Sequence, residues 1–471
     1  MNLPHIGKCT LKGAVMNKLD KIAFIMPRGA VYRYKTGAFG KLIRYAPLTL
    51  PALVSLVPPE MNIECEVYDE GIEVIDATKI EADLICISSI TGASPRAYRY
   101  ADYFRSKGKT VVMGGVHATL CPEEAAQHVD SVQIGLGIEI FPQMLRDYKA
   151  GKLKPVYRAR QDLCYAGFPF PKREIYSSKK MRFITVNSVQ ATYGCRNKCA
   201  FCCTPYSSPG YYHRPVEDVV DEIRQIPGRN FVFVDPSPIE DGYAKELFKA
   251  MIPLKKHWAS PMTIRIGEDR ELLELAVKSG LKGVLVGFET VSQETLRNIR
   301  KGFNSSARFY NAVKLLHDND VAIMGCFVFG LDSDDRDCFK RTLEFVYEAD
   351  IDIPRFTVNT AYPGTEHYAE MKRQNRIIET DWSMYDCQHV ILKPAQMSAE
   401  ELQAGHLQAG HLQAWKEAYR LPNAVKRLAC SRSFPLYSIT SNIAYRMYAA
   451  RLPGYTRDVM CDYSDIGKPV S

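Results

Sequence analysis

The chain has 471 residues, more than one ordinary domain, and at about 150 residues per domain we expect two to four units. Its 46% hydrophobic and 24% charged residues are typical of a soluble globular protein. The net charge of +8 is modest for this length, and no block of five or six basic residues occurs, so the composition disfavours nucleic acid as a partner.

The cysteine content and the N-terminal sequence indicate the cellular compartment of the protein. Fourteen cysteines in so long a chain are too sparse for a disulfide scaffold. Residues 1–19, which we take as an N-terminal extension, lack the apolar stretch of a signal peptide. The longest uncharged apolar run, residues 321–331, is about half of what a membrane helix needs. We therefore expect a cytoplasmic protein with reduced thiols and no transmembrane segment.

Residues 20–150 alternate strand and helix patterns. The expected strands are 21–26, 63–68, 83–88, 110–115 and 131–135, with helices such as 96–107 and 138–149 between them. This alternation predicts an α/β domain with a parallel sheet covered by helices on both faces. Ligands of such sheets bind outside the carboxyl ends of the strands. The small residues at those ends are Ser88, Ser89, Gly92, Gly114, Gly115, Gly135 and Gly137.

Residues 151–180 have no periodicity and are predicted to be a linker. A second series of six βα units is expected over residues 181–375. Its strands are 183–190, 230–235, 262–266, 283–288, 321–329 and 353–359, and its helices are 215–226, 241–252, 269–279, 306–318 and 334–349. Six units are fewer than the eight of a closed barrel, which predicts an open, partial (β/α) barrel.

Residues 376–471 are expected to form a small, mostly helical region. The pentapeptide LQAGH occurs at 402–406 and again at 407–411. His406 and His411 would lie about 140° apart around a helix, so we expect a duplicated solvated helix here and no metal site. Residues 436–451 form a basic amphipathic stretch. We expect it to pack against the barrel, and contact with a membrane is the alternative.

The stretch GCRNKCAFCC, residues 194–203, follows the first expected barrel strand. Cys195, Cys199 and Cys202 have the spacing CxxxCxxC, and Cys203 is adjacent. Consecutive Cys202 and Cys203 cannot easily face one metal, and no second CxxC pair is close, which disfavours tetrahedral zinc. Three thiolates on one tight loop instead suit three irons of a 4Fe-4S cluster. The fourth iron would be open to a small molecule.

This motif, with Phe201 before its last cysteine, resembles the radical S-adenosylmethionine (SAM) superfamily. The resemblance implies a 4Fe-4S cluster on Cys195, Cys199 and Cys202 whose open iron chelates SAM. One electron, from a low-potential donor such as flavodoxin or ferredoxin, would cleave SAM to methionine and a 5′-deoxyadenosyl radical that abstracts a substrate hydrogen. The implied SAM contacts are Phe201, Asp235, Arg265, Gly287, Glu289 and Gly330. For Arg265, a structural ion pair is the alternative role.

Three N-terminal stretches resemble the cobalamin-binding domain that precedes the barrel in one radical SAM subfamily. They are SSITGASPRAY (88–98), VVMGGVHATLCPEEA (111–125) and VDSVQIGLGIEIFPQML (129–145). The D-x-H-x-x-G signature is absent, which implies cobalamin without a protein histidine on cobalt, and His117 as a loop or tail contact. A flavodoxin-like sheet without cofactor is the alternative. The implied cobalamin contacts are Ser88, Ser89, Gly114, Gly115, His117, Gly135 and Gly137.

The sequence therefore predicts a Rossmann-like cobalamin-binding domain, a partial six-unit radical SAM barrel and a C-terminal helical region. We favour a C-methyltransferase that uses methylcobalamin and a 5′-deoxyadenosyl radical on a small-molecule substrate. A cobalamin-dependent oxidative cyclase or rearrangement enzyme shares every motif, and a non-catalytic cobalamin or redox sensor is a further alternative. A tRNA methylthiotransferase is disfavoured because the other cysteines lack the spacing for a second cluster. The sequence identifies neither the substrate nor a catalytic residue.

Overall fold

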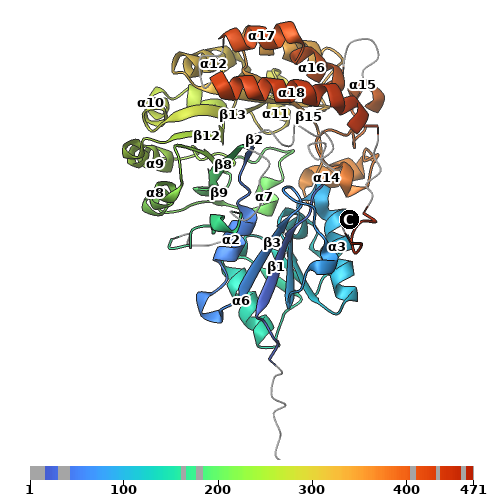
Figure 1. Ribbon diagram of the computed structural model, residues 1–471. Helices are drawn as coiled ribbons and strands as arrows, with labels where there is room; N and C mark the ends of the chain where they lie inside the picture. The colour runs from blue at the N-terminus through green and yellow to red at the C-terminus, as the bar shows by residue number, and fades with distance from the viewer. Residues whose placement is uncertain are drawn as a thin grey trace, which may run out of the picture.

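The computed structural model describes residues 16–29, 43–160, 166–176, 184–403, 410–430, 435–457 and 463–469. Two parallel sheets dominate it: one lies in the N-terminal third of the chain and the other in the middle (Figure 1). Most of the expected N-terminal extension falls outside the described residues.

The N-terminal sheet is parallel throughout, with strand order β3-β1-β4-β5-β6-β7. This order is of the flavodoxin type with one added strand. Alternate residues of each strand point to opposite faces. Ile85 and Met113 thus join the core under α3, whereas Phe24 and Val112 join the core under α6. The strands are β1 (Lys21–Met26), β3 (Glu64–Asp69), β4 (Leu84–Ser88), β5 (Thr110–Gly114), β6 (Ser131–Ile134) and β7 (Val156–Arg158).

Helices cover both faces of this sheet, as predicted. One face carries α3 (Ser94–Ser106), α4 (Val116–Leu120) and α5 (Pro122–His128), and the other carries α2 (Thr49–Ser55) and α6 (Gly137–Lys149). The strand β7 lies in the segment expected to be a linker, so part of that segment belongs to the sheet.

The second sheet has the order β15-β14-β13-β12-β11-β8-β2 and is also parallel. Five of its strands, β8, β11, β13, β14 and β15, match expected barrel strands, and β15 and β2 are the outermost strands among the described residues. The short strand β2 (Ile43–Tyr45) comes from the N-terminal third of the chain and extends the sheet beside β8. The six strands are β8 (Ile184–Val189), β11 (Asn230–Phe233), β12 (His257–Met262), β13 (Leu281–Glu289), β14 (Ala322–Phe329) and β15 (Ile353–Val358).

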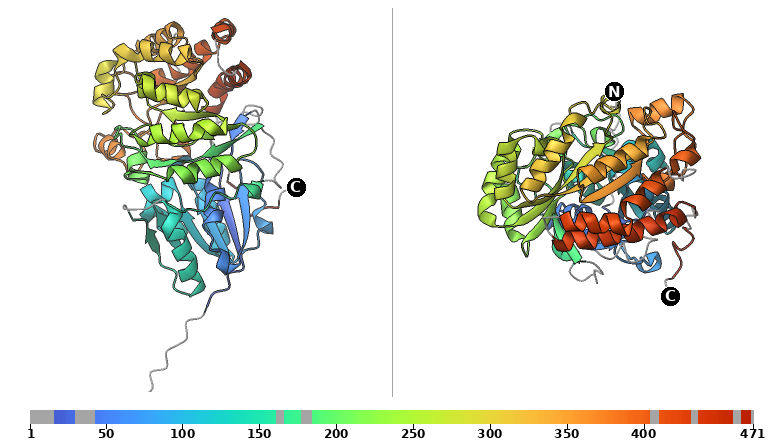
Figure 2. Two further views of the ribbon diagram at one scale, coloured as in Figure 1. Left: turned by 90° about the vertical axis from the view of Figure 1, so that its left-hand side faces the viewer. Right: turned by 90° about the horizontal axis from the view of Figure 1, so that it is seen from above.

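The helices of this series pack outside the sheet over one large apolar core (Figure 2). The helices match the expected ones within a few residues. They are α8 (Val216–Gln225), α9 (Tyr243–Met251), α10 (Arg270–Lys278), α12 (Phe309–Asp318) and α13 (Cys338–Glu348), with the short α11 (Gln293–Asn298) after β13.

The third expected barrel strand, 262–266, is wrong. The strand β12 ends at Met262, and Ile264–Gly267 form the 3-10 helix η7. Its apolar alternation suited a strand, but the chain turns so that Ile264 and Ile266 enter the core, next to α12. Gly267 lies tight against α12: a Cβ there would be 2.7 Å from the carbonyl oxygen of Ala312. Arg265 therefore lies on a helical turn and does not end a strand.

The C-terminal region is mostly helical, as predicted. It comprises α14 (Glu366–Arg373), α15 (Ala399–Gln403), α16 (His411–Ala418), α17 (Leu421–Cys430) and α18 (Pro435–Tyr455). The stretch 436–451 lies within α18, which packs on the barrel through Tyr448 and Leu452, as expected. None of the helices that the structure describes combines the length and the apolar character needed to cross a bilayer.

The expectation of a solvated helix at the LQAGH repeat is wrong for His411. His411 is fully buried, and the indole nitrogen of Trp415 donates to its Nε2 at 3.1 Å. Burial lowers the pKa of His411 to about 4, because a charged imidazole is poorly solvated there. His406 lies outside the described residues.

Candidate active site

The cysteine loop follows β8 through a tight turn. The strand β9 (Thr192–Gly194) leads into it and pairs with β10 (Tyr211–His213) on its far side. Asp235, fully buried after β11, accepts hydrogen bonds from the backbone N–H groups of Ala191 and Thr192 and from the Thr192 hydroxyl. Burial raises the pKa of Asp235 to about 6. These contacts fix the chain that enters the loop, and a SAM contact for Asp235 stays a prediction.

The three motif cysteines are free, partly buried and close together. Burial raises the pKa of the Cys195 thiol, and it raises that of Cys199 to about 12, with Cys202 adding to both effects. Thiols in such surroundings ionise only when a cation compensates the charge, as bound iron does. The backbone N–H of Thr204 already points at the Cys202 sulfur, 3.4 Å away. The donor set therefore fits a thiolate-ligated iron–sulfur cluster.

Cys203 has different surroundings. It is the N-cap of α7 (Thr204–Ser207), and its neighbours include Cys202 and Cys387. Burial raises the pKa of Cys203 to about 12 as well. Cys203 lies on the same loop as the three motif cysteines, so its exclusion from the iron–sulfur cluster stays a prediction.

A buried ion pair lies beside the cysteine loop. The Lys301 ammonium donates to Glu289 Oε1 at 2.5 Å, and both side chains are at most one-tenth exposed. Glu289 ends β13 in the left-handed region, with φ of +64°. A Cβ at Gly287 would displace the Glu289 carboxylate and the Lys301 ammonium from their present positions. The backbone thus makes room for this pair.

Lys301 also acts on the cluster thiols. It opposes the burial-driven rise in the pKa of Cys199, and Glu289 and Cys199 outweigh burial to raise the pKa of Lys301 itself. The backbone N–H of Ala200 donates to the Ile299 carbonyl at 2.9 Å, which ties the two loops together. Lys301 was not predicted, because nothing in its spacing from the cysteines marks it.

Arg265 links the cysteine loop to the neighbouring strand end. Its guanidinium donates to Asn197 Oδ1 at 3.0 Å and to Glu240 Oε2 at 3.1 Å. The Glu240 side chain is almost fully buried and also accepts from the Ser237 hydroxyl. The alternative role foreseen for Arg265, a structural ion pair, is therefore present, and its contact with SAM stays a prediction. The sequence analysis missed Glu240 as its partner.

The two remaining barrel residues are explained by packing. Gly330 has φ of +85°, and a Cβ there would lie 2.6 Å from Leu402 of α15. Phe201 packs against the barrel core. A role for either in SAM binding stays a prediction.

The predicted cobalamin residues gather at the carboxyl edge of the N-terminal sheet, at the ends of β4, β5 and β6. Gly115 has φ of +94°, and a Cβ there would lie 2.7 Å from the Ser89 carbonyl oxygen, so the turn itself requires glycine. Gly135, with φ of +87°, is similarly tight against Ala159. Gly114 and Gly137 have ordinary space around them, and both face Gln133.

Two buried polar atoms on this sheet have no partner within the described part of the chain. They are Gln133 Nε2 and Ser131 Oγ, on alternate residues of β6. An unsatisfied buried amide is costly, and a bound polar group would relieve it. Together with the small residues Gly114 and Gly137 beside Gln133, this fits a large ligand with polar side groups. The sequence analysis did not single out either residue.

His117 joins the two halves of the molecule. It is fully buried, its Nε2 lies 2.9 Å from the Tyr98 hydroxyl and 3.6 Å from Glu124 Oε1, and Trp382 donates to the same Glu124 oxygen at 2.9 Å. His117, Cys121 and Glu124 place possible ligand atoms within 4.8 Å of one another. Because hydrogen bonds already engage His117 and Glu124, we assign the group to the contact with Trp382.

The carboxyl edge of the N-terminal sheet lies against the barrel at the cysteine loop. The helix α4, which follows Gly115, contacts α7, which follows Cys203. The 3-10 helix η4 (Thr91–Ala93) contacts η9 (Trp382–Met384). Figure 1 shows α7 directly above the N-terminal sheet. The two predicted cofactor sites therefore share one interface.

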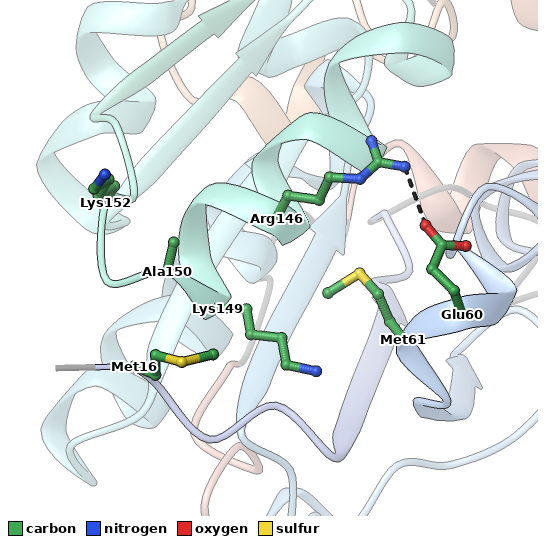
Figure 3. A pocket seen from close by; sticks show the side chains of 7 residues that line it. All are labelled: Met16, Glu60, Met61, Arg146, Lys149, Ala150 and Lys152. Atoms are coloured by element: carbon green, nitrogen blue, oxygen red, sulfur yellow. Dashed lines mark hydrogen bonds and ion pairs between the residues drawn. The ribbon is translucent and has the colours of Figure 1, made fainter. Parts of the chain in front are cut away.

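A surface pocket of about 540 Å³ lies elsewhere. It is lined by Met61 and Arg146, among others, and includes Met16, just before β1 (Figure 3). It is thus at the amino edge of the N-terminal sheet, opposite the predicted cofactor residues. We assign it no part in the site.

Comparison with known proteins identifies the family. Residues 189–346 match the family model of the radical SAM superfamily. The chain is 31% identical over 333 residues to a bacteriochlorophyllide d C-12(1)-methyltransferase of Chlorobaculum tepidum, which covers 68% of this chain and 72% of that protein. The chain belongs to the radical SAM superfamily, and it is an enzyme of the branch that includes this methyltransferase.

A second relative and two solved structures extend the match over nearly the whole chain. The bacteriochlorophyllide d C-8(2)-methyltransferase of the same organism is 28% identical over 440 residues, covering 87% of this chain and 94% of that protein. The cobalamin-dependent SAM radical enzyme OxsB has a similar fold, with a TM-score of 0.66 at 14% identity over 92% of this chain and 72% of its own. The radical SAM methyltransferase TsrM from Kitasatospora setae has a TM-score of 0.61 at 16% identity, covering 77% and 79% of the two chains.

Proposed function

We propose that the protein is a cobalamin-dependent radical SAM C-methyltransferase. The observation that carries this proposal is the contact between α4 and α7, because it brings the glycine-rich edge of one sheet next to the cysteine loop of the other. The names of the two bacteriochlorophyllide methyltransferases, and of TsrM, support methyl transfer as the reaction.

In this proposal Cys195, Cys199 and Cys202 hold the 4Fe-4S cluster and Glu289 orients SAM. The Lys301 ammonium fixes the Glu289 carboxylate in one place, at 2.5 Å, and contributes positive charge beside Cys199. A positioned carboxylate can accept hydrogen bonds from ribose hydroxyls at little further entropic cost. The surrounding core excludes water from this pair.

Cobalamin would lie at the carboxyl edge of the N-terminal sheet. Gly114 and Gly137 leave space beside Gln133, and the unsatisfied Gln133 amide and Ser131 hydroxyl would bind polar groups of the ligand. When bound, the cluster supplies the electron that cleaves SAM, and the cobalamin carries the methyl group to be transferred.

We propose a tetrapyrrole macrocycle as the substrate class. Both methyltransferase relatives act, by name, on bacteriochlorophyllide d. A third relative, 23% identical over 366 residues, is an anaerobic magnesium-protoporphyrin IX monomethyl ester cyclase, whose substrate is a tetrapyrrole as well. We further propose a flavodoxin or ferredoxin as electron donor and a cytoplasmic location, in keeping with the free cysteines among the described residues.

The test is label transfer from SAM carrying a CD3 methyl group. Anaerobically reconstituted enzyme, with cobalamin, a low-potential reductant and bacteriochlorophyllide d, is expected to give a product that has gained the intact CD3 group. The Cys199→Ala variant is the control and should give none. Consumption of the macrocycle with a new ring and no label would contradict methyl transfer and favour the cyclase alternative.

A further inference from the structure

The helices α17 and α18 form one outer surface on the barrel. They contact each other, and Figure 1 shows α17 above α18 at the top of the molecule. The helix α16 contacts both of them. The helix α17 turns Ala424 and Arg427 inward, and α18 turns Asn442 and Tyr448 inward. The opposite side of each helix faces solvent.

The solvent-facing side carries large apolar residues at helical spacing. Leu421 and Val425 of α17 are 59% and 55% exposed, and Ile439 and Ile443 of α18 are 41% and 50% exposed. Each pair is four residues apart, so its members lie on one face of their helix. The two helices contact each other, and we call these two partly exposed apolar pairs the patch.

The same segment is exclusively basic in its charges. Residues 418–457 contain no Asp or Glu, although the whole chain is nearly balanced, with 61 basic and 53 acidic residues. Among the described residues, the exposed basic side chains Arg420, Lys426, Arg446, Arg451 and Arg457 lie on or next to α17 and α18. Arg420 pairs with Glu417, and Lys426 lies 4.0 Å from Asp350. The full set in this segment is Arg420, Lys426, Arg427, Arg432, Arg446, Arg451 and Arg457.

We infer that this surface binds an anionic lipid bilayer peripherally. Exposed apolar side chains on a helix enter the boundary between headgroups and acyl chains, and neighbouring basic side chains pair with anionic headgroups. A second copy of the chain fits less well, because a symmetric contact through this patch would oppose two surfaces of the same positive sign. The inference is independent of the proposed reaction, since neither the cysteine loop nor the substrate enters it.

The experiment is sedimentation of the anaerobically reconstituted full-length protein with vesicles. Vesicles of phosphatidylcholine containing about one-third phosphatidylglycerol are compared with vesicles of phosphatidylcholine alone. We expect binding to the anionic vesicles that exceeds binding to the neutral ones at least about tenfold. This binding should fall when sodium chloride is raised from about 50 to about 500 mM, because the charges are exposed to screening.

Two pairs of variants separate the patch from the rest of the surface. I439S/I443S should weaken binding to the anionic vesicles roughly tenfold, whereas V74S/I378S, at exposed apolar sites on other parts of the molecule, should not. K426E/R457E should weaken it similarly, whereas K79E/K340E, with the same change in net charge at exposed lysines elsewhere, should not. Circular dichroism and iron content check that each variant is folded.

Three results would overturn the inference. One is equal sedimentation with anionic and neutral vesicles, or with neither. Another is equal binding by the patch variants and their controls. The third is a dimer in light scattering that I439S/I443S converts to a monomer, which would show that a second copy covers the patch.

Discussion

The cysteine loop of the barrel and the carboxyl edge of the N-terminal sheet meet at one interface but differ in what fills them. Beside the loop lie charged groups in fixed pairs: Lys301 with Glu289, and Arg265 with Glu240. The carboxyl edge of the N-terminal sheet instead presents glycines, serines and the Gln133 amide, whose nitrogen has no partner among the described residues. In the proposed function, the loop would depend on particular ligands and charges, whereas the edge would depend on small residues and a few polar groups.

This difference predicts which substitutions should impair binding at the loop and which at the edge. A site made of ligands fails when one ligand is removed, because nothing replaces its charge on the metal. A site lined by small residues no longer binds its ligand when a larger side chain fills it. Removal of one hydrogen bond lowers its affinity for the ligand only in part.

Removal of one cluster ligand is expected to have the largest effect. Alanine at Cys195, Cys199 or Cys202 should abolish both the iron–sulfur absorbance and 5′-deoxyadenosine formation, since each change removes one iron's anionic ligand. Alanine at Cys203, on the same loop, should leave the cluster largely intact. Absorbance and iron content after anaerobic reconstitution measure this, and equal iron loss in all four variants would refute the ligand assignment.

Breaking the buried ion pair comes next. Lys301→Met leaves the Glu289 carboxylate buried without its partner, at a cost of about 3 kcal/mol. We expect the rate of 5′-deoxyadenosine formation to fall by about a hundredfold, with iron content near that of the wild type. Lys301→Arg should recover part of the rate.

The matched control for this variant is Lys314→Met, which removes a surface lysine that pairs with Asp318 and is 73% exposed. Exposed pairs of this kind contribute little, so its rate should equal that of the wild type. If Lys301→Met retained full activity, the ion pair would have no part in positioning Glu289.

Filling the space beside Gln133 should act on cobalamin alone. The Gly114→Leu side chain would occupy the room that the glycine leaves next to Gln133, and we expect cobalamin loading to fall below roughly half while iron content stays unchanged. Gly242→Leu is the control, because nothing lies within 4 Å of its Cβ position in the barrel. Absorbance of bound cobalamin after gel filtration gives the loading. Full loading of Gly114→Leu would show that cobalamin does not bind at this part of the edge.

The smallest effect is expected from removal of one polar group. Gln133→Leu deletes the unpaired amide, and the affinity for cobalamin should fall roughly fivefold, as for the loss of one hydrogen bond of about 1 kcal/mol. Titration of the apoprotein with cobalamin measures the affinity. Gln143→Leu, an exposed glutamine on α6 that donates to Asp147, should leave it unchanged. Identical affinities for the two variants would mean that the Gln133 amide does not contact the ligand.

Strand and helix alternation predicted both sheets because each buried strand carries a run of apolar residues long enough to be recognised. It failed where short-range pattern and tertiary packing disagree. Residues 262–266 alternate like a strand, but contact with α12 favours the helical turn η7. The three-residue strands β2 and β7 are too short to carry a period, so their places in the two sheets were not foreseen.

The three cysteines could be singled out from sequence as candidate cluster ligands, because that chemistry requires a particular residue at a particular spacing. Lys301, Glu240 and Gln133 could not, since their contacts join segments whose separation in the chain follows no rule. His411 shows the same limit: its repeat suggested a solvated helix, but α16 packs against β15 and α18, and His411 is buried.

The ratio of two products in one reaction tests whether the cysteine loop and the carboxyl edge of the N-terminal sheet serve one methyl transfer. If they do, each turnover consumes one SAM as methyl donor and one as radical source. With the true substrate and a low-potential reductant, S-adenosylhomocysteine and 5′-deoxyadenosine should then accumulate in a ratio of about one to one. Substrate-dependent 5′-deoxyadenosine with S-adenosylhomocysteine at background would contradict the account.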